Sequence, residues 1–223
     1  MEKQEDIIRD IRTRCRMAMN GMASASMRER GLTYKLNFGL VIQQIKDLAG
    51  QYEANAELAE TLWKEETREL KILSTFLYPI DKFSPDTANR WVTEIPNQEM
   101  REQVCLNLFQ ELPFADQLAI AWGNSEDENI RTSGYWLLVR LLLTKKFEGV
   151  LTADYFSHIW EDIITENTFL RNAALLILKH IGRQSKDEAN LILEKVSIYK
   201  DDQDLLKQEA YNSLDFEFEF FLG

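Results

Sequence analysis

Glycine and proline are scarce in this chain, which has 9 Gly and 4 Pro among 223 residues. Folds built from many short strands need turn residues at short intervals, so this scarcity argues against a β-rich fold and against long loops. No apolar run reaches the ~18 residues of a membrane-spanning helix, so we expect no membrane partner. Residues 1–16 mix charges of both signs without an apolar segment, and we therefore expect no secretory signal.

Cysteine and histidine are also rare, with two of each. Cys15 and Cys105 lie within helical patterns, so we interpret them as small buried hydrophobic residues of a protein in the reducing cytoplasm. His158 and His180 have no ligand spacing with their neighbours, and we expect neither a metal nor another cofactor. Glycine-rich phosphate loops, nucleophile elbows and Ser/His/Asp groupings are missing, so an enzyme here would have to use carboxylates, aromatic rings and arginine.

Basic residues are outnumbered by acidic ones, and the formal net charge of −11 argues against a nucleic-acid partner. The basic residues are nevertheless clustered. Residues 1–35 hold eight Lys or Arg against five Asp or Glu, a net charge of +3. Residues 130–146 (+4) and 168–183 (+3) hold no acid at all. These three segments are either a chance distribution or one basic surface that folding assembles.

Apolar residues recur at the spacing of an amphipathic helix through residues 5–22, and a second helix is predicted for residues 37–52. The stripe of the first helix consists of Ile7, Ile8, Ile11, Cys15, Ala18, Met19 and Met22.

After residue 52 a unit of two helices repeats. The first helix of each unit carries a tryptophan near its end, an acidic or amide-rich turn follows, and the second helix opens with an arginine. The tryptophans are Trp63, Trp91, Trp122 and Trp160, and the arginines are Arg68, Arg101, Arg131 and Arg171. The arginines are 33, 30 and 40 residues apart, and Lys207 marks a fifth, degenerate copy.

A period of this length with two helices per unit is typical of α-solenoids. We predict an all-α fold, an α-α superhelix of the HEAT/armadillo type with about five to six helix pairs, in one domain spanning residues 1–223. Residues 1–52 form its N-terminal helices, residues 53–214 the tandem pairs, and residues 215–223 an acidic, Phe-rich tail. The second helices would line a concave face.

Three features allow two interpretations each. The tryptophans pack between stacked units or serve a site, and we favour packing. The arginines pair with acids of the preceding turn, such as Asp127 or Glu128, or they bind phosphates. Acid and Phe alternate over residues 215–220, which is strand periodicity; this tail either docks as a cap or adds a strand to a partner's sheet.

Three segments resemble the HEAT-like-repeat DNA alkylation repair family, the alkylpurine DNA glycosylases. They are MRERGLTYKLNFGLVIQQIKDLA (27–49), LAETLWKEETRELKILSTFLY (58–78) and NSEDENIRTSGYWLLVRLLL (124–143). The resemblance covers about residues 25–215. It implies a protein that holds the DNA backbone with charged residues. It also implies a carboxylate and two tryptophans that stabilise the cationic sugar as an alkylated base leaves.

The resemblance also indicates which of these elements the chain keeps. Arg131 matches the family's DNA-contacting arginine within one position. The segment 94–109, which should carry the catalytic carboxylate, has no Asp and no Trp: Arg101 lies near that position, and Glu99 is the nearest carboxylate. Leu176 lies where a later tryptophan is expected. We therefore expect degraded catalytic residues, with Glu99 as the candidate catalyst.

The sequence thus supports two functions. The first is binding of duplex DNA in a concave groove, with Arg131 and Arg171 about 10 Å apart on one edge and Trp136 in the core. The second is a non-catalytic scaffold that binds a protein partner. The side chains predicted to contact DNA are Arg131, Arg171, Arg101, Lys145, Lys146 and Lys35. The sequence does not determine the oligomeric state.

Overall fold

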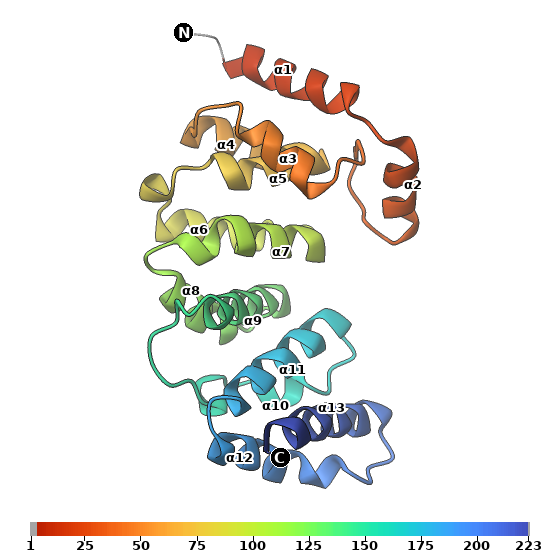
Figure 1. Ribbon diagram of the computed structural model, residues 1–223, viewed down its shortest axis with the longest axis vertical. Coiled ribbons are helices and arrows are strands. Elements are labelled where there is room, and N and C mark those ends of the chain that lie inside the picture. The colour runs from red at the N-terminus through yellow and green to blue at the C-terminus, as the bar shows by residue number, and fades with distance from the viewer. Residues whose placement is uncertain (1–3, 223) are drawn as a thin grey trace. The chain divides into compact units, whose positions relative to one another are not determined.

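The computed structural model describes residues 4–222, which fold almost entirely into helices (Figure 1). The described residues form thirteen α-helices and four short 3₁₀ helices, and their only β pairing is an isolated bridge between Leu36 and Thr67. The all-α prediction is confirmed. No helix in this range is long and apolar enough to cross a membrane. The chain divides into two compact units, Met1–Leu112 and Pro113–Gly223.

The first unit begins with three helices and continues with two helix pairs. Its elements are α1 (Gln4–Met17), α2 (Gly21–Glu29), α3 (Ile42–Ala49), α4 (Ala56–Trp63), α5 (Arg68–Leu77), η1 (Ile80–Lys82), α6 (Pro85–Thr93), α7 (Gln98–Asn107) and η2 (Phe109–Glu111). Helix α4 packs on α5, and α5 packs in turn on α3 and α7 (Figure 1).

The second unit contains three helix pairs. Its elements are α8 (Ala115–Gly123), α9 (Glu128–Leu143), η3 (Ala153–Tyr155), α10 (Ile159–Asp162), α11 (Thr168–Gly182), α12 (Lys186–Val196), η4 (Ser197–Tyr199) and α13 (Leu205–Leu222). The second helices pack on one another, α9 on α11 and α11 on α13. Together with the first unit this makes five successive pairs from α4 to α13, within the predicted five to six.

The tryptophans of the first unit form a stacked core, as predicted. The rings of Trp63 and Trp91 lie parallel with their centroids 3.9 Å apart, and both side chains are completely buried. Each indole N–H donates to a carboxylate, Trp63 to Glu94 at 2.6 Å and Trp91 to Glu60 at 3.3 Å. A buried indole needs such a partner, so these glutamates stabilise the stack between consecutive pairs.

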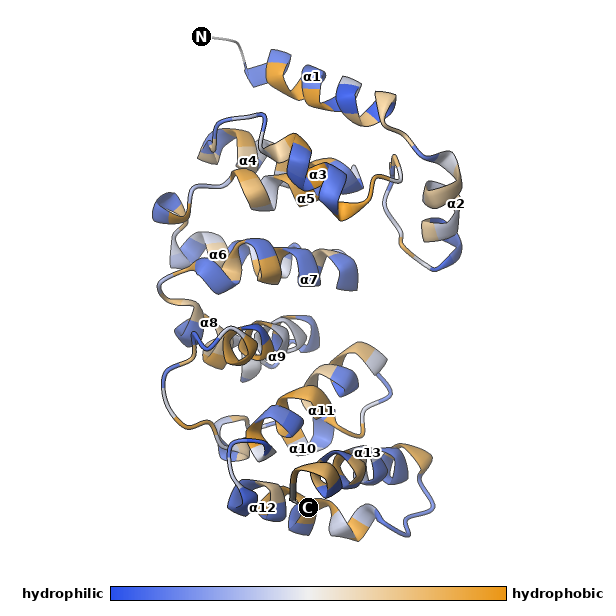
Figure 2. Cartoon of the chain, viewed as in Figure 1, coloured by the Kyte–Doolittle hydropathy of each residue, from blue (hydrophilic) through white to orange (hydrophobic). Residues whose placement is uncertain are grey.

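Nine of the sixteen residues of helix α9 are buried, because α8 and α11 pack against it. Figure 2 shows apolar residues along the ribbons of α9 and α11. Gly134 makes the contact with α8 possible. A Cβ at this position would lie 2.2 Å from the backbone nitrogen of Gly123, so only glycine lets the two backbones approach this closely.

The boundaries of the N-terminal helices differ from the prediction. Helix α1 ends at Met17 instead of residue 22, and α2 begins at Gly21. The reason is Asn20, whose side-chain oxygen accepts the backbone N–H of Ala23 and so caps a new helix. The helix predicted for residues 37–52 spans only Ile42–Ala49.

The strand periodicity assigned to the C-terminal tail is wrong, because α13 continues through it to Leu222. Leu214 and Phe218, four residues apart, are both completely buried, and the ring of Phe218 fills the space beside Gly182 of α11. Phe216 and Phe220 are exposed. Burial of one helical face outweighed a short alternating pattern, and the last residue of the predicted tail, Gly223, lies outside the described residues.

Candidate nucleic-acid interface

Arg68, the first arginine of the series, is buried at the start of α5. Its Nε and Nη2 donate to the carboxylate of Glu99 at 2.9 and 2.7 Å, and its Nη1 donates to the carbonyl of Leu40 at 2.7 Å. Burial by itself lowers the pKa of Arg68, but the carboxylates of Glu99 and Glu69 outweigh it and raise that pKa above its ordinary value. Arg68 therefore joins α5 to α7, one repeat further along the chain.

Glu69, the neighbour of Arg68, anchors the loop before α3. Its completely buried carboxylate accepts the backbone N–H groups of Phe38 and Gly39 at 3.0 Å and of Leu40 at 3.3 Å. Gly39 has a φ of +76°, a conformation that favours glycine. Arg68 and Glu69, which belong to the family-like segment 58–78, thus hold the loop before α3 in place.

Arg131 repeats this arrangement in the second unit. Its Nε and Nη2 both donate to Asp162 at 2.8 Å, and the hydroxyl of Tyr135 donates to the same carboxylate at 2.8 Å. The predicted partners Asp127 and Glu128 are wrong. Asp127 instead caps α9 by accepting the N–H groups of residues 129 and 130, and Asp162 lies 31 residues after Arg131. The hydrogen bonds with Asp162 raise the pKa of Arg131.

The other two arginines of the series bind residues that are close to them in the sequence. Arg101 is buried in α7 and donates to the side-chain oxygen of Gln98 at 2.5 Å, and burial lowers its pKa. Arg171 is half-buried and donates to the backbone carbonyl of Thr165 at 2.6 Å. Of the side chains predicted to contact DNA, Arg131 and Arg101 are therefore buried within the units, and Arg171 is partly accessible.

Glu99, the candidate catalyst, lies in the first turn of α7 with both oxygens held by Arg68. The hydroxyl of the half-buried Tyr34 donates to Asn97 beside it at 3.2 Å. Burial, and next the charge of Glu99, raise the pKa of Tyr34. The negative charge of Glu99 is thus already paired with a buried cation.

The lysines that were predicted to contact DNA all lie on the surface. Lys35 pairs with Glu66 at 2.7 Å, and Lys145 and Lys146 follow the last turn of α9. The segment 145–151 runs to the end of α11, where Leu151 and Gln184 exchange two hydrogen bonds.

Helices α9 and α11 pack on each other and run in the same direction, because their N-terminal ends are also joined, by a hydrogen bond from Asn167 to Glu128. Their C-terminal ends therefore form one edge. We call Lys145, Lys146, Arg183 and Lys186 the basic edge; all four are exposed. The acids of this edge are Glu148, in the loop after Lys146, Glu217, which pairs with Arg183, and Asp187 and Glu188, which follow Lys186 in the first turn of α12.

Trp136, which we expected in the core, is only half-buried. Its buried indole Nε1 has no hydrogen-bond partner among the described residues. Arg140 lies one turn further along the same face of α9. The 3.6-residue period places Trp136 and Arg140 on one face of α9, but it does not tell whether a neighbouring helix covers that face. The core prediction for Trp136 was wrong because this face is only partly covered.

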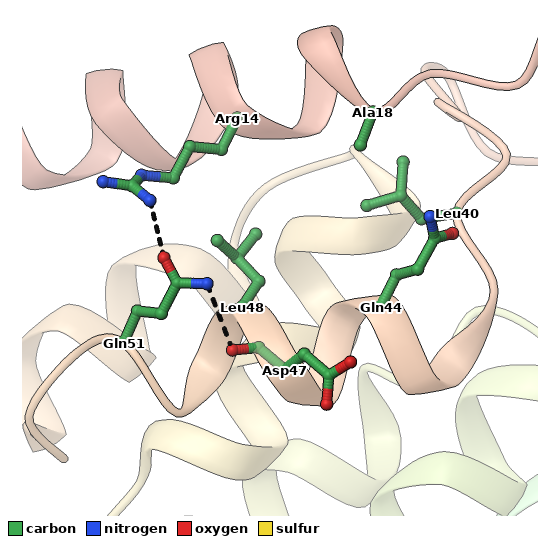
Figure 3. A pocket seen from close by; sticks show the side chains of 7 residues that line it. All are labelled: Arg14, Ala18, Leu40, Gln44, Asp47, Leu48 and Gln51. Carbon is green, nitrogen blue, oxygen red and sulfur yellow. Dashed lines mark hydrogen bonds between the residues drawn. The ribbon is translucent and has the colours of Figure 1, made fainter.

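A surface cavity of about 260 Å³ lies between α1 and α3 in the first unit. Figure 3 shows Arg14 reaching toward Gln51, whose side-chain amide donates to the backbone carbonyl of Asp47. Arg14 also pairs with Asp10 at 2.7 Å. The cavity lining holds no Ser, Thr, Cys, Lys or His side chain, and no group of three potential metal ligands occurs among the described residues.

Comparisons with known proteins agree with this architecture. The model of the family described as DNA alkylation repair enzyme matches residues 22–214. A solved structure is similar over 95% of this chain and 94% of its own, with a TM-score of 0.69 and 17% identity. It comes from a new family related to the HEAT-like repeat DNA glycosylases, with affinity for branched DNA structures. This likeness confirms the predicted HEAT-like fold, while no curated protein matches the chain.

Proposed function

Because the chain belongs to the DNA alkylation repair enzyme family, we propose that it binds DNA, duplex or branched, without excising a base. The observation that carries this proposal is the basic edge, four exposed cations at the joined ends of α9 and α11. Branched DNA is included because the similar solved protein has affinity for it.

Because the chain is acidic overall, binding to DNA requires a local basic surface of this kind. A chain with a net charge of −11 is repelled by a polyanion unless cations gather on one surface. Each phosphate that a lysine or arginine neutralises releases counterions, which favours binding at low salt. Lys145 and Lys146 supply two such cations in the loop after α9.

The state of Glu99 supports binding without excision. Departure of an alkylated purine leaves a cationic sugar, which a carboxylate stabilises only when it can face that charge. Both oxygens of Glu99 are bound by the Arg68 guanidinium, so its charge is already compensated.

A salt series with a labelled duplex tests the proposed surface. The double variant Lys145→Ala, Lys146→Ala should bind more weakly, and its slope of log K against log salt should be smaller by about 2, since two phosphate contacts are lost. The matched control removes two exposed lysines of the first unit, Lys64→Ala with Lys82→Ala, and should keep the wild-type slope. Equal slopes for both variants would remove the basic edge from the interface.

An excision assay tests the second half of the proposal. The protein is incubated with a duplex that carries an alkylated purine, and abasic sites are counted after alkaline cleavage. We expect no release above the protein-free background, for wild type and for Glu99→Gln alike. Release by wild type that Glu99→Gln abolishes would make Glu99 a catalytic residue and overturn this half.

Protein binding is a second candidate function, favoured by the exposed face of α13. Phe216 and Phe220 contact each other there with ring centroids 5.6 Å apart, and Asp215 and Glu219 lie beside them. An acidic aromatic face repels DNA and fits an apolar groove with a basic rim. In a pull-down, a partner bound through this face should be lost with Phe216→Ser, Phe220→Ser. We also propose a cytoplasmic location, because the two buried cysteines form no disulfide with each other.

A further inference from the structure

Three methionines are exposed where α1 turns into α2. Met17 is 83% exposed, Met19 56% and Met22 85%, and we call these three residues the methionine corner. A large apolar side chain alone on a surface needs no explanation, but three within six residues form a patch, and such patches mark binding sites.

The backbone beneath this corner is held firmly. The N–H of Asn20 donates to the carbonyl of Phe38 at 2.9 Å, and the buried hydroxyl of Ser24 donates to the carbonyl of Asn37 at 2.7 Å. Gly39 approaches so closely that a Cβ would lie 2.3 Å from the carbonyl oxygen of Asn20. The loop that contains Gly39 is in turn bound by Glu69. The backbone that carries the methionine corner is therefore fixed to the rest of the first unit by buried hydrogen bonds.

Exposed cations flank the methionines in the sequence. Arg16, Arg28 and Arg30 are exposed, and Glu29 is the single acid in residues 16–30, so this segment has a net charge of +2. Arg16 and Arg30 form no ion pair with any residue that the structure describes, and Arg28 donates to Ser24 at 2.8 Å. An apolar tip with a cationic border complements a nucleic acid in which a base face is open between two phosphates.

We propose that the methionine corner is a wedge that packs against the open base faces at a DNA branch point, while Arg16, Arg28 and Arg30 contact the flanking phosphates. This inference rests on the proposed DNA binding. Methionine is among the apolar side chains that DNA-bending proteins insert between base steps, and its flexible thioether adapts to irregular surfaces. In a linear duplex the same insertion requires unstacking two base pairs, whereas a branch point already exposes base faces. The wedge therefore discriminates branched from linear DNA.

The test compares affinities for a four-way junction and for a linear duplex of the same sequence. In the triple variant Met17→Ser, Met19→Ser, Met22→Ser the preference for the junction should fall about tenfold, with duplex affinity unchanged within about twofold. The triple leucine variant should restore the preference. Leu191→Ser with Ile198→Ser, which removes two exposed apolar side chains from the second unit, should have no effect.

A junction with 2-aminopurine at the branch point reports insertion directly. Wild type should raise the fluorescence of this base by changing its stacking, and the triple serine variant should not. An unchanged junction preference in a serine variant that melts like wild type would overturn the wedge and leave DNA binding intact. Absence of wild-type binding to either DNA would overturn the proposed function and the wedge with it. Binding to anionic phosphatidylserine vesicles that requires the methionines, without any junction preference, would assign the corner to a membrane and also overturn the wedge.

Discussion

The ion pair between Arg131 and Asp162 should be a main stabilising contact of the second unit. Asp162 accepts three hydrogen bonds, two from Arg131 and one from Tyr135, all at 2.8 Å. The side chains of Arg131 and Asp162 are only 7% and 3% exposed, so water cannot replace a lost partner. Asp162→Asn keeps the shape of the side chain and removes its charge, which leaves a buried guanidinium uncompensated.

Breaking a buried pair by removing one partner costs about 3–5 kcal/mol. At about 2–4 °C of melting temperature per kcal/mol, Asp162→Asn should lower the melting temperature by about 6–20 °C. Tyr135→Phe removes one hydrogen bond and should cost only about 1 kcal/mol. Replacing both charges by apolar side chains, Arg131→Met with Asp162→Leu, should cost less than Asp162→Asn alone, because no buried charge then remains.

Urea unfolding followed by circular dichroism at 222 nm measures these free energies. Asp154→Asn, at an exposed aspartate of the same unit, is the matched control and should be neutral. Duplex affinity of Arg131→Met, measured where the variant is still folded, should equal that of wild type, because the arginine is buried. Two results would refute this reasoning: a cost below about 1 kcal/mol for Asp162→Asn, or an Arg131→Met protein of normal stability whose salt slope for DNA is smaller.

Three further predictions concern single side chains. Gly134→Ala should destabilise the fold by several kcal/mol or prevent folding, because its Cβ meets the backbone of α8, whereas Gly21→Ala, where a Cβ meets nothing within 4 Å, should melt at or above the wild-type temperature. His180 has a pKa lowered by burial, so the unfolded chain binds its proton first and stability falls as the pH drops below about 6.5; melting curves between pH 7.5 and 5.5 should shift less in His180→Gln. Burial raises the pKa of Cys15 to about 12, so a thiol reagent at pH 8 should label this residue only after denaturation, and fast labelling of native protein would contradict the packing of α1.

The helical repeat could be predicted from the sequence because its signals are local. The tryptophans close the first helices of four units, and an arginine opens each second helix. Burial of Trp63, Trp91 and Trp122 follows from their place on apolar helical faces, which a 3.6-residue period reveals without knowledge of the neighbours. The same is true of α9, whose apolar residues surround the helix and therefore predict a helix covered on all sides.

The partners of the charged side chains were decided by the tertiary structure. Arg131 pairs with Asp162 and Arg68 with Glu99, in both cases 31 residues later, because stacking brings equivalent positions of consecutive pairs together. The predicted partners Asp127 and Glu128 are closer in sequence, but Asp127 caps α9 and Glu128 accepts a hydrogen bond from Asn167. Proximity in sequence therefore predicted the wrong partner for Arg131. Because Arg131 is buried, the proposed DNA surface consists of exposed lysines and an arginine near the C-terminal ends of α9 and α11.

Exposure at both ends of the chain was also decided by packing. Met22 continues the apolar stripe of α1 in the sequence, yet the cap formed by Asn20 starts a new helix and leaves Met22 on the surface. In α13 the alternating acids and phenylalanines resemble a strand, but contact with α11 buries Phe218 and leaves Phe220 exposed. A periodic pattern specifies which residues share a face, whereas only the neighbouring helices determine whether that face is covered.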